Sequence, residues 1–216
     1  MAIQSDERKL SIYRDASVAA SYDERWAGSS GQRRDERTRR AVERALARVG
    51  SIESLLDVPC GAGRFSAWLA ESTPRYVGAD AALPMLEQTR TKCAAPLLAA
   101  DLAALPLRTG SFDVTLCIRL MHLVRDPQRR MAFLGELARV SRRAVIVDFV
   151  QAESLKVWYA RARSAVGLRD HAPSALSREQ IRAELDQAGL EPWAFEALRS
   201  PSWMSDKVVV LARLKG

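Results

Sequence analysis

The stretch Leu55-Leu56-Asp57-Val58-Pro59-Cys60-Gly61-Ala62-Gly63-Arg64-Phe65 decides how this chain folds. An apolar strand over 55–58 ends at a glycine-rich turn, and a helical pattern follows from about residue 64 to 70. Gly61 and Gly63 let the backbone turn tightly beneath a ligand, towards which the N–H groups of the next helix then point. Asp57 would repel a pyrophosphate but could pair with an ammonium group. The stretch therefore favours a cofactor that carries an amino acid over a dinucleotide.

The same alternation of strand and helix continues on both sides of this stretch. A helical pattern over 33–49, after the breaker at 28–31, precedes it, and the segments that follow are strands at 75–79, 96–100, 112–118 and 144–150 and helices at 84–92 and 127–140. This order predicts an α/β fold, a parallel sheet with helices on both faces. After a capping box at Ser177 and Gln180, a helix ends at Gly189. Two strands, at 193–198 and 207–214, have no helical pattern between them and predict an antiparallel hairpin at the sheet edge.

Length and composition predict one globular domain. The 216 residues are 48% apolar and 27% charged, which suits a packed core. We divide the domain into a helical N-terminal cover (1–50), a cofactor-binding core (51–150), a lid or substrate helix (151–176) and a closing helix with hairpin (177–216). The polar N-terminus has no apolar signal core, and the three cysteines show no C-x-x-C spacing, so we expect a cytoplasmic protein without a metal site or a disulfide framework. The net charge of +7 fits either a codon bias towards arginine or an anionic partner.

Two further acids follow the glycine-rich turn at strand ends. Asp80 ends the strand at 75–79, and Asp101 ends the strand at 96–100. A carboxylate in the first position can accept both hydroxyls of a ribose, and one in the second can accept an adenine N–H. A single acid at a strand end is often only a helix cap or a solvated loop group. Three acids on one sheet edge beside a G-x-G turn instead indicate a nucleoside-binding site.

Residues 54–150 resemble the core of the class I S-adenosylmethionine-dependent methyltransferases, in particular the small branch related to the ubiquinone and menaquinone enzymes. The matching residues are Asp57–Gly63, Asp80, Asp101 and Ser111-Phe112-Asp113-Val114; Ala100 departs from the glycine that often precedes the adenine-side acid. The resemblance implies a Rossmann-like, doubly wound, seven-stranded sheet of order 3-2-1-4-5-7-6 with strand 7 antiparallel. It also implies that S-adenosylmethionine is bound by Asp57, Pro59, Gly61, Gly63, Asp80, Ala81, Met85, Asp101, Leu102, Arg119 and Tyr22.

The function implied by the resemblance is methyl transfer to a small-molecule or lipid-like acceptor by in-line displacement. His122 lies just after the fourth strand and is either a catalytic base or hydrogen-bonding group, or a packed loop histidine. A base is needed only where the acceptor atom is protonated. His171 is a weaker candidate for substrate contact. Whether oxygen, nitrogen or carbon is methylated stays open.

Two other functions compete with methyl transfer. A nicotinamide-dependent oxidoreductase would need a third glycine where the chain has Ser66, and a non-catalytic cofactor-binding protein is the second alternative. Nucleic acid is disfavoured as a partner, because Cys117-Ile118-Arg119-Leu120 stands where amino-methylating enzymes of DNA and RNA carry an Asn/Asp-Pro-Pro-aromatic motif.

The cover of the site is predicted from two segments outside the core. Tyr13 and Tyr22 are candidates to close over the cofactor, with Arg14, Arg25 or an arginine within 37–40 reaching its carboxylate. The helix expected at 152–166 is basic and aromatic, and forms half of a lid, rests on an anionic membrane surface, or packs on the sheet. We expect residues 1–30 and 152–176 to face each other across the cleft, with His122 on its floor.

Overall fold

The computed structural model describes residues 11–168 and 174–215. Within them one sheet has the strand order β3-β2-β1-β4-β5-β7-β6. Its strands are β1 (Ser54–Asp57), β2 (Arg75–Asp80), β3 (Leu97–Ala99), β4 (Phe112–Cys117), β5 (Ser141–Val150), β6 (Leu190–Ala197) and β7 (Lys207–Leu214). The neighbours from β3 to β5 are parallel, whereas β7 runs antiparallel to both β5 and β6. The predicted order and the closing hairpin are confirmed.

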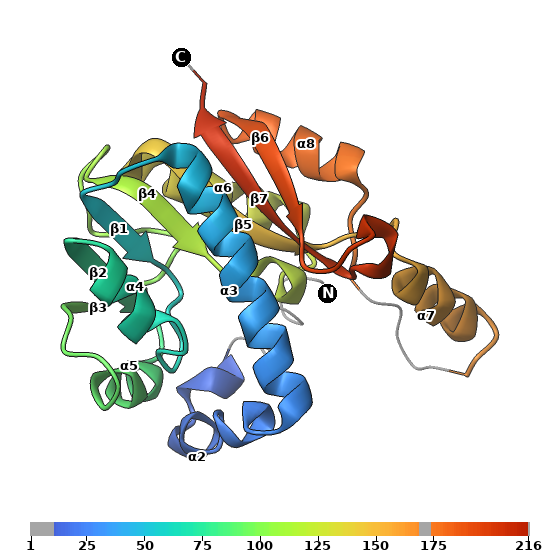
Figure 1. Cartoon of the computed structure of the whole chain (residues 1–216), viewed down its shortest axis with the longest axis horizontal. Helices are drawn as coiled ribbons and strands as arrows, with labels where there is room; N and C mark the ends of the chain where they lie inside the picture. Colours follow the sequence, from blue (N-terminus) through green and yellow to red (C-terminus); the bar gives the residue numbers. More distant parts are fainter. Residues whose placement is uncertain (1–10, 169–173, 216) are drawn as a thin grey trace.

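Helices cover both faces of the sheet (Figure 1). The apolar sides of α3 (Ser29–Val49) and α4 (Ser66–Ser72) share one buried cluster with the sheet, and those of α6 (Pro127–Val140) and α8 (Arg178–Gln187) share the other. Beside β2 and β3 lies α5 (Leu83–Arg90). The shorter elements are η1 (Ile12–Arg14), α2 (Ala16–Ala20), η2 (Glu24–Trp26), η3 (Met121–Leu123), α7 (Leu155–Ala165) and η4 (Ser202–Met204).

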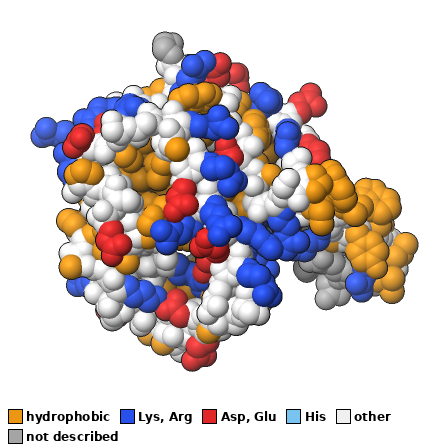
Figure 2. Space-filling view, viewed as in Figure 1, with side chains coloured by type: hydrophobic (Ala, Val, Ile, Leu, Met, Phe, Trp, Pro, Cys, Tyr) orange, Lys and Arg blue, Asp and Glu red, His pale blue; other side chains and the backbone are white. Residues whose placement is uncertain are grey.

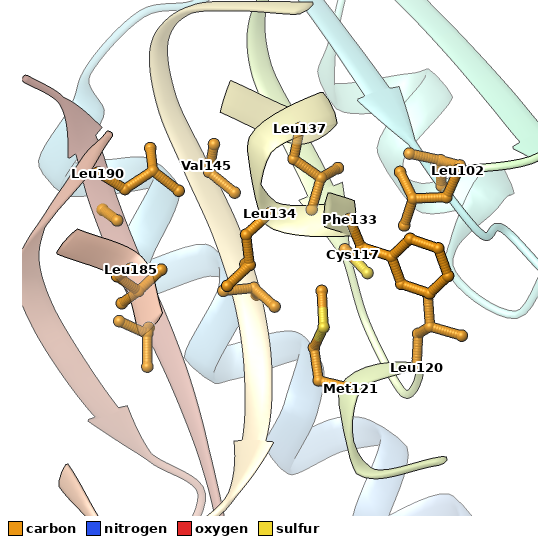
Figure 3. Packing of buried hydrophobic residues seen from close by; sticks show 14 of the residues in the cluster. Leu102, Cys117, Leu120, Met121, Phe133, Leu134, Leu137, Val145, Leu185 and Leu190 are labelled. Atoms are coloured by element: carbon orange, nitrogen blue, oxygen red, sulfur yellow. The ribbon is translucent and has the colours of Figure 1, made fainter. Parts of the chain in front are cut away.

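The larger buried cluster fixes the turn that follows β4. Phe133 and Leu134 of α6 pack with Leu120, which precedes η3, and with Met121, its first residue (Figure 3). A buried ion pair between Arg130 and Glu184 ties α6 to α8, with Arg130 Nε 2.9 Å from Glu184 Oε2. This packing holds the turn after β4, where Arg119 and His122 lie, in one position.

The expected breaker at 28–31 is wrong, because α3 begins at Ser29 and includes Gly31. A Cβ on Gly31 would lie 2.4 Å from the carbonyl oxygen of Trp26. Glycine is therefore present so that the backbone of η2 can approach α3, and the helix continues through it. On the same helix, Arg44 and Arg48 bind Glu196 of β6, at 2.7 and 2.9 Å, and so tie α3 to the sheet.

One surface of the molecule exposes large apolar side chains. It consists of α7, residues 166–168 and η4, and we call it the α7 surface. Its exposed apolar residues are Leu155, Trp158, Tyr159, Val166, Leu168, Trp203 and Met204. Figure 1 shows α7 projecting away from α2, and Figure 2 shows the apolar atoms gathered on this projection. Among the described residues, no helix is long and apolar enough to cross a membrane.

Candidate active site

A cavity of about 720 Å³ lies at the carboxyl ends of β1, β2 and β4. Asp57, Asp80 and Asp101, which the sequence placed at successive strand ends, all line it. Of the other predicted cofactor residues, the lining contains Pro59, Gly61, Ala81, Met85, Leu102, Arg119 and Tyr22. We call this space the main cavity. Such an edge, where parallel strands end, is the usual ligand site of an open α/β sheet.

Asp57 is buried at the end of β1, with 3% of its surface exposed. Its Oδ2 lies 3.1 Å from the hydroxyl of Tyr76, which also lies 2.8 Å from Ser66 Oγ. Burial raises the pKa of the Asp57 carboxyl to about 7, the Tyr76 hydrogen bond opposes that rise, and the charge of Asp80 adds to it. A buried carboxyl without a cationic partner gains most from a ligand that brings a positive charge.

Asp80 shapes the glycine-rich turn as well as lining the cavity. Its two carboxylate oxygens accept the backbone N–H groups of Gly61, at 2.9 Å, and Ala82, at 2.8 Å. Burial raises the pKa of Asp80, while these backbone hydrogen bonds oppose the rise. The carboxylate thereby holds the turn after β1 against the end of β2, and it retains lone pairs for further donors.

The two glycines of the turn have different roles. Both have a positive φ, +59° at Gly61 and +74° at Gly63. A Cβ on Gly61 would meet nothing within 4 Å, whereas one on Gly63 would lie 2.9 Å from Thr89 Cγ2 and 3.0 Å from Thr89 Cα. Gly61 lines the main cavity and Gly63 does not. Gly63 therefore permits the turn to pack closely on α5. Because Gly63 does not line the main cavity, its predicted contact with the cofactor is not supported by the cavity lining.

The far end of the main cavity combines an exposed acid with buried apolar side chains. Asp101 is exposed, and its Oδ1 accepts the N–H of Ala103 at 2.9 Å. Met85 and Leu102 are 2% and 5% exposed, so they give this end an apolar lining next to a carboxylate. This combination suits a flat heteroaromatic base with an exocyclic N–H group.

The N-terminal segment forms one wall of the main cavity. Tyr13 and Tyr22 meet edge to face, with ring centroids 6.0 Å apart and planes at 77°. Both pack against a small apolar cluster that contains Ala62 and Met85. Lys92 adds a link, because it pairs with Asp23 and donates to the carbonyl oxygen of Ala62 at 2.6 Å. The predicted cover thus lies against the glycine-rich turn; its contact with a cofactor stays a prediction.

Arg119, two residues after the end of β4, has a strained backbone conformation. Its φ is +69°, which is uncommon for a residue other than glycine, and its N–H donates to Asp148 Oδ1 at 2.5 Å. The guanidinium pairs with Asp35 and lies 4.2 Å from the ring centroid of Trp26. Arg64 pairs with the same Asp35, and its guanidinium lies 4.4 Å from the Trp26 centroid. Burial and the neighbouring charge of Arg119 lower the pKa of Arg64 to about 10.

A second cavity of about 270 Å³ shares Tyr13, Tyr22 and Arg119 with the main cavity. His122 lines this second cavity, and the main cavity lining does not contain it. The pKa of the buried Asp148 is lowered despite its burial by the charges of Lys207 and His122 and by its hydrogen bonds. His122 therefore lies close to an ionised acid beside the second cavity; its catalytic role stays a prediction. His171 lies outside the described residues.

The structure differs from the expected arrangement of the cover. The described residues of 152–176 line neither cavity, and α7 instead contacts η4. The predicted arrangement, in which residues 1–30 and 152–176 face each other across the cleft, therefore has no support in the two linings; α7 follows the carboxyl end of β5 and projects outward (Figure 1). The role of 151–176 as a lid or substrate helix stays a prediction.

Sequence reasoning missed four residues that matter at this site. They are Asp35, Arg64, Trp26 as a stacking partner, and Asp148. One signal was present, since Asp148 is a charged residue inside the otherwise apolar run of 144–150. Within 11–168 and 174–215, no group of three or more His, Cys, Asp or Glu side chains could hold a metal ion.

Comparisons with known proteins, by sequence and by structure, both find methyltransferases. A family model described as a methyltransferase domain matches residues 55–144. The magnesium protoporphyrin IX methyltransferase of Synechocystis PCC 6803, solved with bound S-adenosylhomocysteine, superposes with a TM-score of 0.75 at 15% identity, over 97% of this chain and 100% of that one. A methyltransferase from Clostridium acetobutylicum gives 0.66 at 15% identity, over 93% and 98%. At these identities the structures establish the fold.

Two curated relatives are similar in sequence. The malonyl-[acyl-carrier protein] O-methyltransferase of Salmonella typhimurium is 34% identical over 170 residues, which are 76% of this chain and 63% of the relative. The demethylmenaquinone methyltransferase of Clavibacter sepedonicus is 35% identical over 120 residues, 53% of this chain and 48% of the relative. The chain thus spans less than two thirds of the length of either.

Proposed function

Because this chain belongs to the class I S-adenosylmethionine-dependent methyltransferase superfamily, we propose that it transfers a methyl group from S-adenosylmethionine to a small-molecule or lipid-like acceptor. The observation that carries the proposal is the main cavity, which brings Asp57, Asp80 and Asp101 together at the ends of adjacent strands. Each acid suits one part of the cofactor: an ammonium group, two ribose hydroxyls and an adenine amino group. The lining therefore fits the whole cofactor.

The protein's contribution to the reaction is mainly alignment. The cofactor supplies a methyl group already activated by its sulfonium. Asp57 would hold the amino-acid end, Asp80 the ribose, and the apolar pair Met85 and Leu102 the adenine, so that the acceptor enters from the side of Arg119. Tyr13 and Tyr22 line both cavities and would keep water from the boundary between them.

The need for a base depends on the acceptor. In the displacement, an acceptor lone pair forms a bond to the methyl carbon, the carbon–sulfur bond breaks, and its electron pair stays on sulfur. A carboxylate is ionised at neutral pH and needs no base, whereas a hydroxyl or amine must lose a proton. His122 lines the second cavity, so it is the residue we propose for that proton. The Salmonella relative is named as an O-methyltransferase of malonyl-[acyl-carrier protein], which supports an oxygen acceptor.

The α7 surface supports a lipid-like acceptor or its membrane. Trp158 and Tyr159 are 65% and 59% exposed, and Lys156, Arg161 and Arg163 belong to the same helix. Aromatic and basic side chains together on a projecting helix suit the surface of an anionic bilayer. The three cysteines are all free, which accords with the cytoplasmic location that we propose.

The test is cofactor binding measured by calorimetry. We expect S-adenosylhomocysteine to bind in the micromolar range, about −8 kcal/mol, and NAD not to bind. Asp101→Asn replaces an acceptor oxygen with a donor and should weaken binding by about 1–3 kcal/mol. Glu87→Gln, a matched change at an exposed acid on α5, should bind like the wild type. Binding of NAD instead of S-adenosylhomocysteine would favour the oxidoreductase reading and refute the proposal.

The competing reading of a non-catalytic binding protein needs a separate measurement. Tritiated S-adenosylmethionine should label an acceptor from a panel of carboxylic acids, phenols and quinols, with S-adenosylhomocysteine as the second product. Cofactor binding without label transfer to any class of acceptor would favour that reading.

A further inference from the structure

The second cavity is lined by an excess of positive charge. Arg34, Arg119, His122 and Lys207 contribute to its lining, and no acidic side chain does. Two carboxylates lie behind the lining: Asp35 pairs with both Arg119 and Arg64, and Asp148 lies 2.9 Å from Lys207 Nζ. Among the described residues, Arg64, Arg119 and Lys207 form their ion pairs with two carboxylates, Asp35 and Asp148, while the charge of Asp23 also acts on Arg64. With Arg34, these cations exceed their ion-pair partners by two before His122 is counted.

Arg34 provides the cation that is free to bind. Its side chain is exposed, and it forms no ion pair with any described residue. Its guanidinium lies 5.3 Å from the Trp26 ring centroid, so it is held over the ring at the wall of the cavity. A guanidinium in this state can still form two parallel hydrogen bonds with a planar oxyanion.

Trp26 provides a donor that has no acceptor. Its Nε1 is buried and has no hydrogen-bond partner within the described part of the chain, although Trp26 lines the second cavity. A buried N–H group without a partner costs free energy. Arg119 and Arg64 lie within 4.2 and 4.4 Å of the ring centroid, so the ring is fixed in position. An unsatisfied N–H group on a residue that lines a cationic cavity is one that an acceptor atom of a ligand can satisfy.

We propose that the second cavity binds a carboxylate group of the methyl acceptor, with Trp26 Nε1 and the guanidinium of Arg34 as its donors. The inference rests on the proposed function, because the cavity adjoins the main cavity through Tyr13, Tyr22 and Arg119. A carboxylate matches both donors, since its two oxygens accept in one plane. A neutral acceptor would leave the excess positive charge without a counter-ion and the indole N–H group without a hydrogen-bond acceptor.

The test uses hexanoate, hexyl phosphate and 1-hexanol as probes of equal chain length, titrated into the protein saturated with S-adenosylhomocysteine. Hexanoate should bind at least tenfold more tightly than hexanol. Arg34→Ala should weaken hexanoate binding at least tenfold, and Trp26→Phe, which keeps a ring between the arginines, at least fivefold. Arg33→Ala removes an exposed arginine that lines neither cavity and should leave binding unchanged.

The outcomes separate this inference from the proposed function. Neither Arg33 nor Arg34 lines the main cavity, so Arg33→Ala and Arg34→Ala should bind S-adenosylhomocysteine like the wild type. If S-adenosylhomocysteine binds but hexanoate binds no better than hexanol, or equally well to Arg34→Ala, the carboxylate site is refuted. Tighter binding of hexyl phosphate than of hexanoate would also overturn it, in favour of a phosphate. Failure of S-adenosylhomocysteine to bind would refute the proposed function itself.

Discussion

Asp57 has two properties that together favour a positively charged ligand. It is buried, and its hydrogen-bonding neighbour is the hydroxyl of Tyr76 and not a cation. In the folded protein its pKa is about 7, above the usual value of about 3.9 for an unfolded chain. The free energy of unfolding should therefore fall as the pH rises from about 4 to 7, because the unfolded chain releases its proton first.

The same shift predicts that cofactor affinity depends on pH. A ligand ammonium pairs with the ionised carboxylate, so binding of S-adenosylhomocysteine should strengthen roughly tenfold between pH 6 and pH 8. Calorimetry at both values measures it. Asp57→Asn should bind more weakly and with little dependence on pH, whereas Asp101→Asn should keep the wild-type slope. An unchanged slope in Asp57→Asn would place the titrating group elsewhere.

The residues that could not be predicted are those whose partners are distant in sequence. Asp35 and Arg119 are 84 positions apart, and no local pattern joins them. Asp57, Asp80 and Asp101 were predictable because Asp57 and Asp80 end strands and Asp101 follows the end of β3 by two residues. The ends of parallel strands lie on one edge of the sheet. The contact of Gly63 with Thr89 depends on how α5 packs, so its role could not be told from that of Gly61 by sequence.

Among the elements, those with strong local signals were predicted well. The bounds of α6 match the expected 127–140, since Pro127 stands in its first turn. The capping box of Ser177 and Gln180 is confirmed at the start of α8. The predicted start of α3 was several residues too late, because glycines at 28 and 31 normally interrupt a helix. In the structure Gly31 lies inside the helix, where the absence of a side chain allows close contact with Trp26. The position of α7 depends on tertiary contacts, which its helical periodicity does not contain.

The position of the N-terminal segment predicts where a ligand will order the chain. Arg14 lines the main cavity, and Arg161 of α7 lines neither cavity. S-adenosylhomocysteine should therefore slow tryptic cleavage after Arg14 at least threefold and leave cleavage after Arg161 unchanged. Mass spectrometry of timed digests distinguishes the sites. Slowing at both sites would restore the two-part cover expected from the sequence, and slowing at neither would show that the cover does not respond to cofactor.

For the molecule as a whole, the α7 surface is the feature that the cofactor site does not explain. An exposed apolar patch that projects from a monomer is typical of a contact surface. Its tryptophans, Trp158 and Trp203, are 65% and 53% exposed. Because the net charge of the chain is +7, we predict that this contact is an anionic lipid surface.

Vesicle binding tests this contact. The protein should co-sediment with phosphatidylglycerol vesicles at least fivefold more strongly than with phosphatidylcholine vesicles, and added salt should weaken binding. Trp158→Ser should reduce it severalfold. Trp193→Ser is the matched control, since Trp193 is 48% exposed but belongs to β6. Equal loss in both variants, or equal binding to both lipids, would contradict the assignment of α7 as the contact.

The order of the strands has a consequence for synthesis. Among the seven strands β7 comes last in sequence, yet it lies inside the sheet between β5 and β6. Until β7 leaves the ribosome, β5 presents an unpaired apolar edge, and β6 has no neighbour in the sheet. Such an edge can pair with another chain. A nascent chain that stalls before Lys207 should therefore hold its cofactor-binding half nearly complete while exposing the edge most prone to aggregation, so that completion of the whole sheet depends on β7.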